Sequence, residues 1–130
     1  MADSASETFT VTEDDTASAL GSGDLFVLGT PRLVAWCEAV TCAALDDLAP
    51  GVTSVGARVE IDHLAPNAIG DEVEIQATVA ERDERTVEFD VEAVSGDLTV
   101  ARGRIRRALV NGERFMTRLG ARSDEAAESP

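Results

Sequence analysis

The chain has 130 residues, 44% of them hydrophobic, which suits one globular domain and leaves no room for a second. Its 25 acidic residues outnumber 11 arginines, and with no lysine the formal net charge is −14. The negative electrostatic potential of such a chain argues against a nucleic-acid backbone as its partner. Acidity without lysine is also typical of salt-adapted proteins, although a GC-rich genome would favour arginine as well, so halophily is a hypothesis here.

Neither a leader nor an anchor is expected. The first ten residues, MADSASETFT, are acidic and contain no apolar segment. No stretch approaches the roughly 20 apolar residues that span a bilayer. Cys37 and Cys42 share a predicted helix and point in different directions, so they cannot bridge each other. Two free thiols favour a reducing compartment, and we predict a cytoplasmic protein that binds no membrane.

The two ends of the chain differ in composition from its middle. Residues 1–6 are small and polar and residues 120–130 are acidic, so we predict disordered tails around a domain at 7–119. Residues 7–12 alternate as a first strand. A polar, glycine-rich stretch then leads to Asp24–Leu28, which we interpret as a lid or pocket wall, with Phe26 as a candidate substrate contact.

One long helix is predicted between Gly29 and Gly51. Thr30 is the expected N-cap and Pro31 the first helical residue. Apolar-face residues recur at three- and four-residue spacing, namely Leu33, Val34, Cys37, Val40, Thr41, Ala44, Leu45 and Leu48. Glu38 falls on or beside this face, where a carboxylate is costly unless it is paired or protonated. Such groups collect at functional sites.

Four alternating segments follow, at residues 55–63, 73–79, 87–93 and 98–110. Their short connections predict an antiparallel meander. His63, the only histidine, continues the apolar side of the first segment and should point inward. The sheet must cover one apolar face, and the helix is the only candidate. We therefore predict an α+β domain in which about five antiparallel strands wrap one central helix, the hotdog layout, with exposed edges that favour a homodimer.

Thr30, Glu38 and His63 are expected to converge at one end of this domain. A carboxylate acts as base or nucleophile, an imidazole protonates a leaving group, and a hydroxyl orients either one. Purely structural interpretations stay open at this point. In these interpretations Thr30 only caps the helix and Glu38 reaches solvent at the edge of the helix. His63 is then a structural residue at a strand end, with its hydrogen bonds made within the protein.

Several short motifs occur together in a fixed order. They are Gly29-Thr30 with Glu38, Gly56 with His63, Ala65-Pro66 with Gly70, and the segments at 102–110 and 113–115. On these motifs the chain resembles the fluoroacetyl-CoA-thioesterase-like branch of the hotdog thioesterases over residues 25–118. The resemblance implies that Thr30, Glu38 and His63 are the catalytic threonine, glutamate and histidine. It also implies that the backbone N–H of Gly56 faces the acyl group.

The resemblance is not complete. Ile105 stands where relatives often have a histidine, and the segment before Thr30 does not match the lid of the fluoroacetate-specific member. Fluoroacetyl selectivity is therefore not expected.

Three arginines, Arg102, Arg104 and Arg106, share one face of the last predicted strand. Because arginine binds phosphates bidentately, they are candidate ligands for coenzyme A. The alternative is that they offset acidic residues on neighbouring strands.

The sequence thus predicts an acyl-CoA thioesterase. Glu38 attacks the carbonyl or activates water, His63 protonates the thiolate, and Thr30 orients the carboxylate. The rival interpretation is a non-catalytic hotdog dimer that binds acyl-CoA or serves as an interaction module. We expect no cofactor besides the coenzyme A of the substrate. No metal is expected either, because one histidine and two ill-spaced cysteines give no ligand set.

Overall fold

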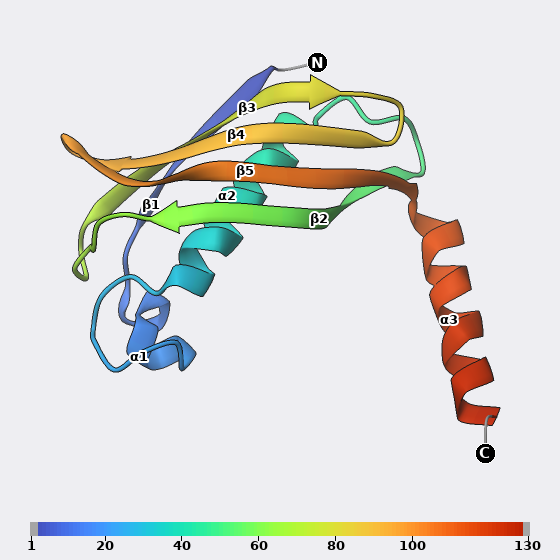
Figure 1. The fold of residues 1–130 in the computed structure, drawn as a ribbon, viewed down its shortest axis with the longest axis horizontal. Helices are drawn as coiled ribbons and strands as arrows, with labels where there is room; N and C mark the ends of the chain where they lie inside the picture. The colour runs from blue at the N-terminus through green and yellow to red at the C-terminus, as the bar shows by residue number, and fades with distance from the viewer. Residues whose placement is uncertain (1–2, 129–130) are drawn as a thin grey trace.

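The computed structural model describes residues 3–128, and it describes side chains as far as residue 122. The elements, in chain order, are β1 (Ser4–Thr10), the 3-10 helix η1 (Glu13–Asp15), α1 (Ala17–Leu20), α2 (Thr30–Ala44), β2 (Val52–His63), β3 (Glu72–Arg82), β4 (Thr86–Ser95), β5 (Leu98–Asn111) and α3 (Gly112–Glu128). Figure 1 shows α2 lying against one side of the curved sheet, while α3 projects from its far end. None of the described helices is long and apolar enough to cross a membrane.

The sheet has five antiparallel strands in the order β1-β3-β4-β5-β2. This confirms the predicted α+β architecture, in which one helix packs on a five-stranded sheet, whereas the second long helix, α3, was not predicted. The predicted meander is right only for β3, β4 and β5, because β2 pairs with β5 rather than with β3. The connection from β2 to β3 crosses the end of the sheet, and its backbone bonds other segments: Leu64 N–H donates to Val100 and Gly70 N–H to Val11. β2 is consequently an edge strand.

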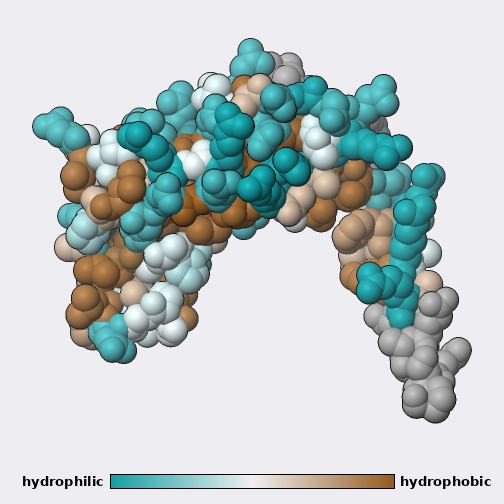
Figure 2. All heavy atoms as spheres, viewed as in Figure 1, coloured by the Kyte–Doolittle hydropathy of each residue, from teal (hydrophilic) through white to brown (hydrophobic). Residues whose placement is uncertain are grey.

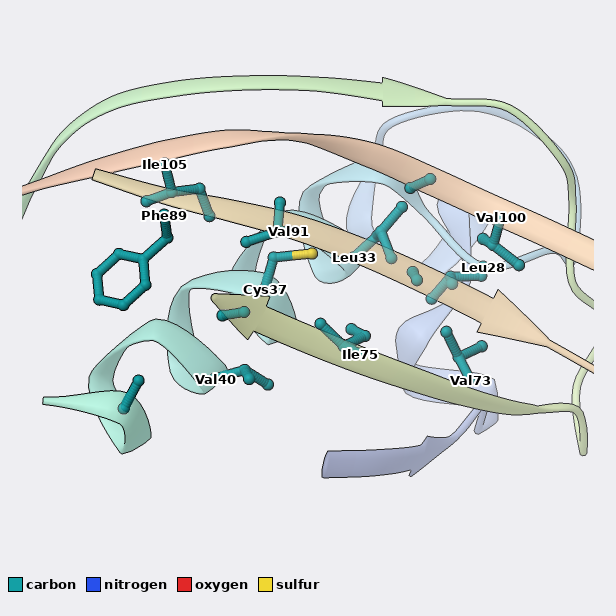
Figure 3. Packing of buried hydrophobic residues seen from close by; sticks show 14 of the residues in the cluster. Leu28, Leu33, Cys37, Val40, Val73, Ile75, Phe89, Val91, Val100 and Ile105 are labelled. Atoms are coloured by element: carbon teal, nitrogen blue, oxygen red, sulfur yellow. The ribbon is translucent and has the colours of Figure 1, made fainter. Parts of the chain in front are cut away.

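The core lies between α2 and the inner face of the sheet, as Figure 3 shows. The helix buries Leu33, Cys37, Val40, Thr41 and Ala44, which are members of the predicted apolar face. Alternate residues of the strands meet them, among them Val73, Ile75, Val87, Phe89, Val91 and Ile105. This two-residue alternation is what a sheet with one covered face requires.

Both ends of α2 differ from the prediction. Gly29, with extended backbone, is the N-cap, and Thr30 is already helical. The Gly29 N–H donates to the Asp15 carbonyl, and its Cα packs so closely on Ala17 that a Cβ would lie 3.1 Å from that backbone. The Thr30 hydroxyl is thereby released from capping. The helix ends at Ala44 because two aspartates follow, and negative charge is unfavourable at a helix C-terminus.

The predicted tails are wrong for most of their length. β1 begins at Ser4, because its backbone pairs with β3 from Ser4↔Thr78 onward, so residues 4–6 belong to the sheet. Residues 120–128 continue α3, which starts where the Asn111 side chain accepts from the Arg114 N–H. Residues 1–2 and 129–130 of those tails lie outside the described residues.

Candidate active site

Thr30 and His63 form one side-chain pair at the start of α2 and the end of β2. The distance between Thr30 Oγ1 and His63 Nδ1 is 2.8 Å. A shallow pocket of about 230 Å³ lies beside the imidazole, lined by Val27, Leu28, Leu64, Ala65 and Pro66. Because Thr30 is freed from capping, its hydroxyl is available to fix the orientation of the ring.

Burial lowers the pKa of His63 below its ordinary value, and a backbone hydrogen bond at Ala65 acts in the opposite direction. The imidazole is therefore neutral at pH 7. Its Nε2 is buried and makes no hydrogen bond of normal geometry within the described chain. When the Thr30 hydroxyl donates to Nδ1, the proton of the neutral ring is on Nε2, which can then act only as a hydrogen-bond donor.

Glu38 forms a second centre in the middle of α2. Arg107 Nη1 donates to Glu38 Oε2 at 3.2 Å. The same guanidinium donates from Nε to the Ser54 hydroxyl at 2.8 Å and from Nη2 to the Ser54 carbonyl at 3.3 Å. The Arg107 side chain is 8% exposed and the Glu38 side chain 36%. The arginine is thus a fixed, buried cation that positions a carboxylate still open to solvent.

Gly56 of β2 lies directly against that carboxylate. A Cβ at this position would lie only 2.7 Å from Glu38 Oε2. The pairing of β2 with β5 also shifts register between Gly56 and Arg58. The glycine therefore leaves space in which a small group can approach both the carboxylate and the β2 backbone.

The expected convergence of Thr30, Glu38 and His63 is only partly present within one chain. Thr30 and His63 meet, whereas Glu38 contacts Gly56 and Arg107. Thr30 and Glu38 are eight residues apart on α2, which is a rise of roughly 12 Å. No hydrogen bond joins Glu38 to Thr30 or His63 among the described residues. Within one chain these candidate residues therefore lie in two separate groups, the Thr30–His63 pair and the cluster around Glu38.

The three candidate coenzyme A ligands lie on the outer face of the sheet, away from α2. Arg104 Nε is 3.0 Å from Asp90 Oδ1, and Arg106 Nη2 is 4.0 Å from Glu88 Oε1. Arg102 lies between Glu92 of β4 and Asp62 of β2 in the strand register. The outer face therefore carries alternating positive and negative side chains rather than a positive stripe, as the alternative interpretation of these arginines supposes. We do not propose these arginines as phosphate ligands.

The segment before α2 forms an apolar wall beside the Thr30–His63 pair. Val27 bridges to Ala68, which fixes the segment against the loop between β2 and β3. Leu25 and Phe26 are 67% and 66% exposed, and Leu64 next to His63 is 55% exposed. Figure 2 shows apolar surface gathered on the lobe around α1. Val27 and Leu28 of this segment line the pocket beside His63, whereas Phe26 is exposed and is not among the residues that line it.

Cys37 is not available as a nucleophile. Burial raises the pKa of its thiol to about 12, with the neighbouring Glu38 charge adding to the effect. Cys37 is a core residue, as its place on the apolar face of α2 indicates, whereas Cys42 is exposed. No cluster of three histidine, cysteine or acidic residues suited to a metal occurs in the described part of the chain.

Arg107 is the site residue that sequence reasoning missed. It belongs to a run of arginines, and its neighbours in that run point outward. The alternation of side chains along the strand could have revealed it. Ile105 and Arg107 are two residues apart and so share one face of β5, and Ile105 is fully buried. An arginine on a buried face needs a carboxylate partner, and Glu38 was the unexplained carboxylate.

Residues 11–113 match the model of the family described as FlK, fluoroacetyl-CoA-specific thioesterase. Solved structures agree in fold. A variant of FlK in complex with acetyl-CoA is 21% identical, with a TM-score of 0.86 over 93% of this chain and 96% of that one.

Two bacterial structures are similar to the same degree. A hypothetical thioesterase-superfamily protein of Thermus thermophilus is 24% identical, with a TM-score of 0.86 and coverage of 98% and 94%. A hot-dog-like protein of Thermanaerovibrio acidaminovorans is 25% identical, with a TM-score of 0.84 and coverage of 92% and 89%. No curated protein matches significantly.

Proposed function

Because the chain belongs to the FlK family of fluoroacetyl-CoA-specific thioesterases, we propose that it hydrolyses a small acyl-CoA thioester to the free acid and coenzyme A at a site containing Glu38. The observation that carries this proposal is the Glu38 carboxylate, held by Arg107 at 3.2 Å against a glycine. A partly exposed carboxylate fixed beside an open backbone is suited to act on a small carbonyl group.

Glu38 supplies the attack in one of two ways. In the first, an oxygen of Glu38 bonds to the thioester carbon, the carbon–sulfur bond breaks, and the CoA thiolate leaves, which gives a mixed anhydride that water then hydrolyses. In the second, Glu38 takes a proton from a water that attacks the same carbon. In both, the Gly56 N–H stabilises the charge that develops on the carbonyl oxygen.

Neutral His63 stabilises the departing thiolate by donating a hydrogen bond from its imidazole, and Thr30 orients the ring. The 2.8 Å contact between Thr30 Oγ1 and Nδ1 supports the orienting role of Thr30. The reaction then balances, because the proton that water loses ends on the thiolate, and the products are the free acid and the thiol of coenzyme A. Thr30 consequently acts on the histidine rather than on the carboxylate for which the sequence suggested it.

The complete site requires a second copy of the chain. β2 is a long edge strand, and Val59 at its middle is 40% exposed. Gly56 and His63 lie symmetrically about the midpoint between Val59 and Glu60. Antiparallel pairing of two β2 strands about this point would bring His63 of the partner subunit opposite Gly56, and hence near Glu38. The Thr30–His63 pair of one subunit and Glu38 of the other would then form one site in a homodimer.

The first experiment measures release of free thiol from acetyl-, propionyl- and butyryl-CoA, in dilute buffer and in molar salt. Glu38→Gln keeps the shape of the side chain but removes its basicity, so we expect turnover to fall on the order of 10²-fold or more. Coenzyme A binding without hydrolysis by the wild type would favour the binding-module interpretation. Full activity in dilute buffer would contradict the halophile hypothesis.

Mixing two inactive variants tests the shared site in the same assay. A heterodimer of Glu38→Gln and His63→Gln chains retains one intact site if the two groups come from different subunits. Refolded mixtures should then recover up to about one quarter of wild-type activity. No recovery, with heterodimers demonstrated, would mean that one chain supplies both residues.

A further inference from the structure

Helix α3 projects from the sheet and leaves an apolar face exposed. Phe115, Met116 and Leu119 are between 41% and 62% exposed, and their spacing puts them on one side of the helix. We call these three residues the α3 stripe. The main contacts of α3 within its own chain are with β5 and β2, near the start of the helix. Because a helix in water gains most of its stability from packing its apolar face, the α3 stripe is suited to contact another surface.

The shape of the molecule indicates what that surface is. Figure 1 shows α3 and the lobe around α1 projecting past the edge strand β2, at its two opposite ends. Between them lies a hollow, and Figure 2 shows apolar surface on the side of α3 that faces it. The 12 residues of β2 span roughly 36 Å, so the hollow is far wider than a small ligand. A second copy of the chain, paired along β2, would fill it.

The pairing of two β2 strands determines which residues α3 meets. It sets His63 of the partner subunit opposite Gly56, so the residues that follow His63 in the partner run alongside the first residues of β2. Helix α3 begins at this same place, because the Gly112 N–H donates to the Gly51 carbonyl at 3.0 Å. The first turns of α3 therefore lie next to residues 64–66 of the partner.

This segment of the partner is also apolar. Leu64 is exposed, and with Ala65 and Pro66 it lines the shallow pocket beside His63. Contact with the α3 stripe removes apolar surface of both subunits from water. We propose that the α3 stripe of one subunit packs on residues 64–66 of the other and forms an outer wall of the partner's His63 pocket; this assignment rests on the proposed function and its homodimer.

The proposal fixes which chain supplies each part of a site. One subunit provides Glu38 together with the α3 wall, because both lie beside the partner's His63. The other subunit provides the Thr30–His63 pair and the pocket that the wall closes. Each site in the dimer is then built from both chains, and α3 belongs to the same chain as the carboxylate.

Cross-linking of the full-length protein tests the contact without any reaction. In a Cys42→Ser background, which leaves only a buried cysteine, Leu64→Cys is combined with Met116→Cys or with Leu119→Cys and treated with a short bis-maleimide. Within one chain these positions lie beyond opposite ends of β2, so the reagent can join only different subunits. We expect covalent dimers on a denaturing gel. Leu64→Cys with Thr117→Cys is the matched control, because Thr117 lies on the opposite side of α3 from Leu119 and should not cross-link.

A monomeric protein, or dimers in which neither stripe position cross-links above the control, would overturn the proposal. Thioester hydrolysis by such a protein would leave the proposed function standing. Cross-linked dimers of a protein that hydrolyses no thioester would support the α3 contact and refute the proposed function instead.

Mixed dimers provide the second readout. In the heterodimer of Glu38→Gln and His63→Gln chains, the surviving site takes Glu38, and α3 with it, from the His63→Gln chain. Leu119→Glu in that chain sets a carboxylate against the apolar wall of the surviving site. We expect its kcat/KM to be roughly tenfold below that of the dimer with Leu119→Glu in the Glu38→Gln chain, where α3 faces the inactive site. Both dimers contain the same substitutions, so general effects on folding cancel. Equal kcat/KM values would overturn the proposal.

Discussion

The two faces of β5 carry arginines in ion pairs of nearly equal length and very different surroundings. On the inner face, Arg107 lies 3.2 Å from Glu38, and the two side chains are 8% and 36% exposed. On the outer face, Arg104 lies 3.0 Å from Asp90, and those side chains are 56% and 58% exposed. Distance alone would make the outer pair the stronger. Burial reverses that order, because an exposed pair is screened by water and a buried cation cannot be left alone.

The largest expected difference comes from removing each arginine in turn. Arg107→Met should lower the free energy of unfolding by about 3 kcal/mol, at the low end for a broken buried pair because Glu38 is partly exposed. Arg104→Met should change it by less than about 1 kcal/mol. Urea denaturation of both variants measures the two values. Equal losses would show that the faces do not differ energetically.

Arg107→Lys sharpens the same comparison. It keeps the positive charge but not the planar fork that contacts Glu38 and Ser54 together. Its stability should fall between the wild type and Arg107→Met. A lysine variant as stable as the wild type would mean that charge alone is needed at this position.

Gly56→Ala tests whether the inner face serves activity rather than stability. The added Cβ would lie 2.7 Å from Glu38 Oε2, the mobile end of a side chain, so the carboxylate must shift while the strands stay in place. A displaced catalytic group costs rate, and we expect kcat/KM to fall roughly 10- to 100-fold. The melting temperature should change little. Thiol release and thermal unfolding together measure the two effects.

Gly120→Ala is the matched control, since no atom lies within 4 Å of a Cβ at that position in α3. It should leave both activity and melting temperature near the wild-type values. A Gly56→Ala enzyme of full activity would show that Glu38 does not need this space.

The sequence predicted which residues face inward, but not which residues they contact there. Periodicity identified α2, the four later strands and the inward positions of Glu38 and His63, because burial imposes a repeat on local sequence. The neighbours of β2 and the partner of Arg107 could not be read in this way. They depend on pairing between residues 69 positions apart along the chain, as in Glu38 and Arg107, and no local pattern encodes that. Helix α3 and the start of β1 were missed because the small, polar and acidic residues near both ends of the chain indicated disorder.

The smallest expected effect concerns His63 and pH. Burial lowers its pKa in the folded protein below 6.5, so the native state binds fewer protons than the unfolded state as the pH falls through this range. The stability linked to neutral His63 is present above pH 6.5 and is lost as the pH falls through the folded-state pKa. Wild-type protein should therefore lose more unfolding free energy between pH 7.5 and about pH 5 than His63→Gln, which has no ring to protonate. Urea denaturation at the two pH values measures the difference, and acidic residues common to both proteins cancel from it. If the wild type instead lost less than the variant, the imidazole would be stabilised as a cation, and the neutral, hydrogen-bond-donating form that the proposed mechanism assigns to it would be wrong.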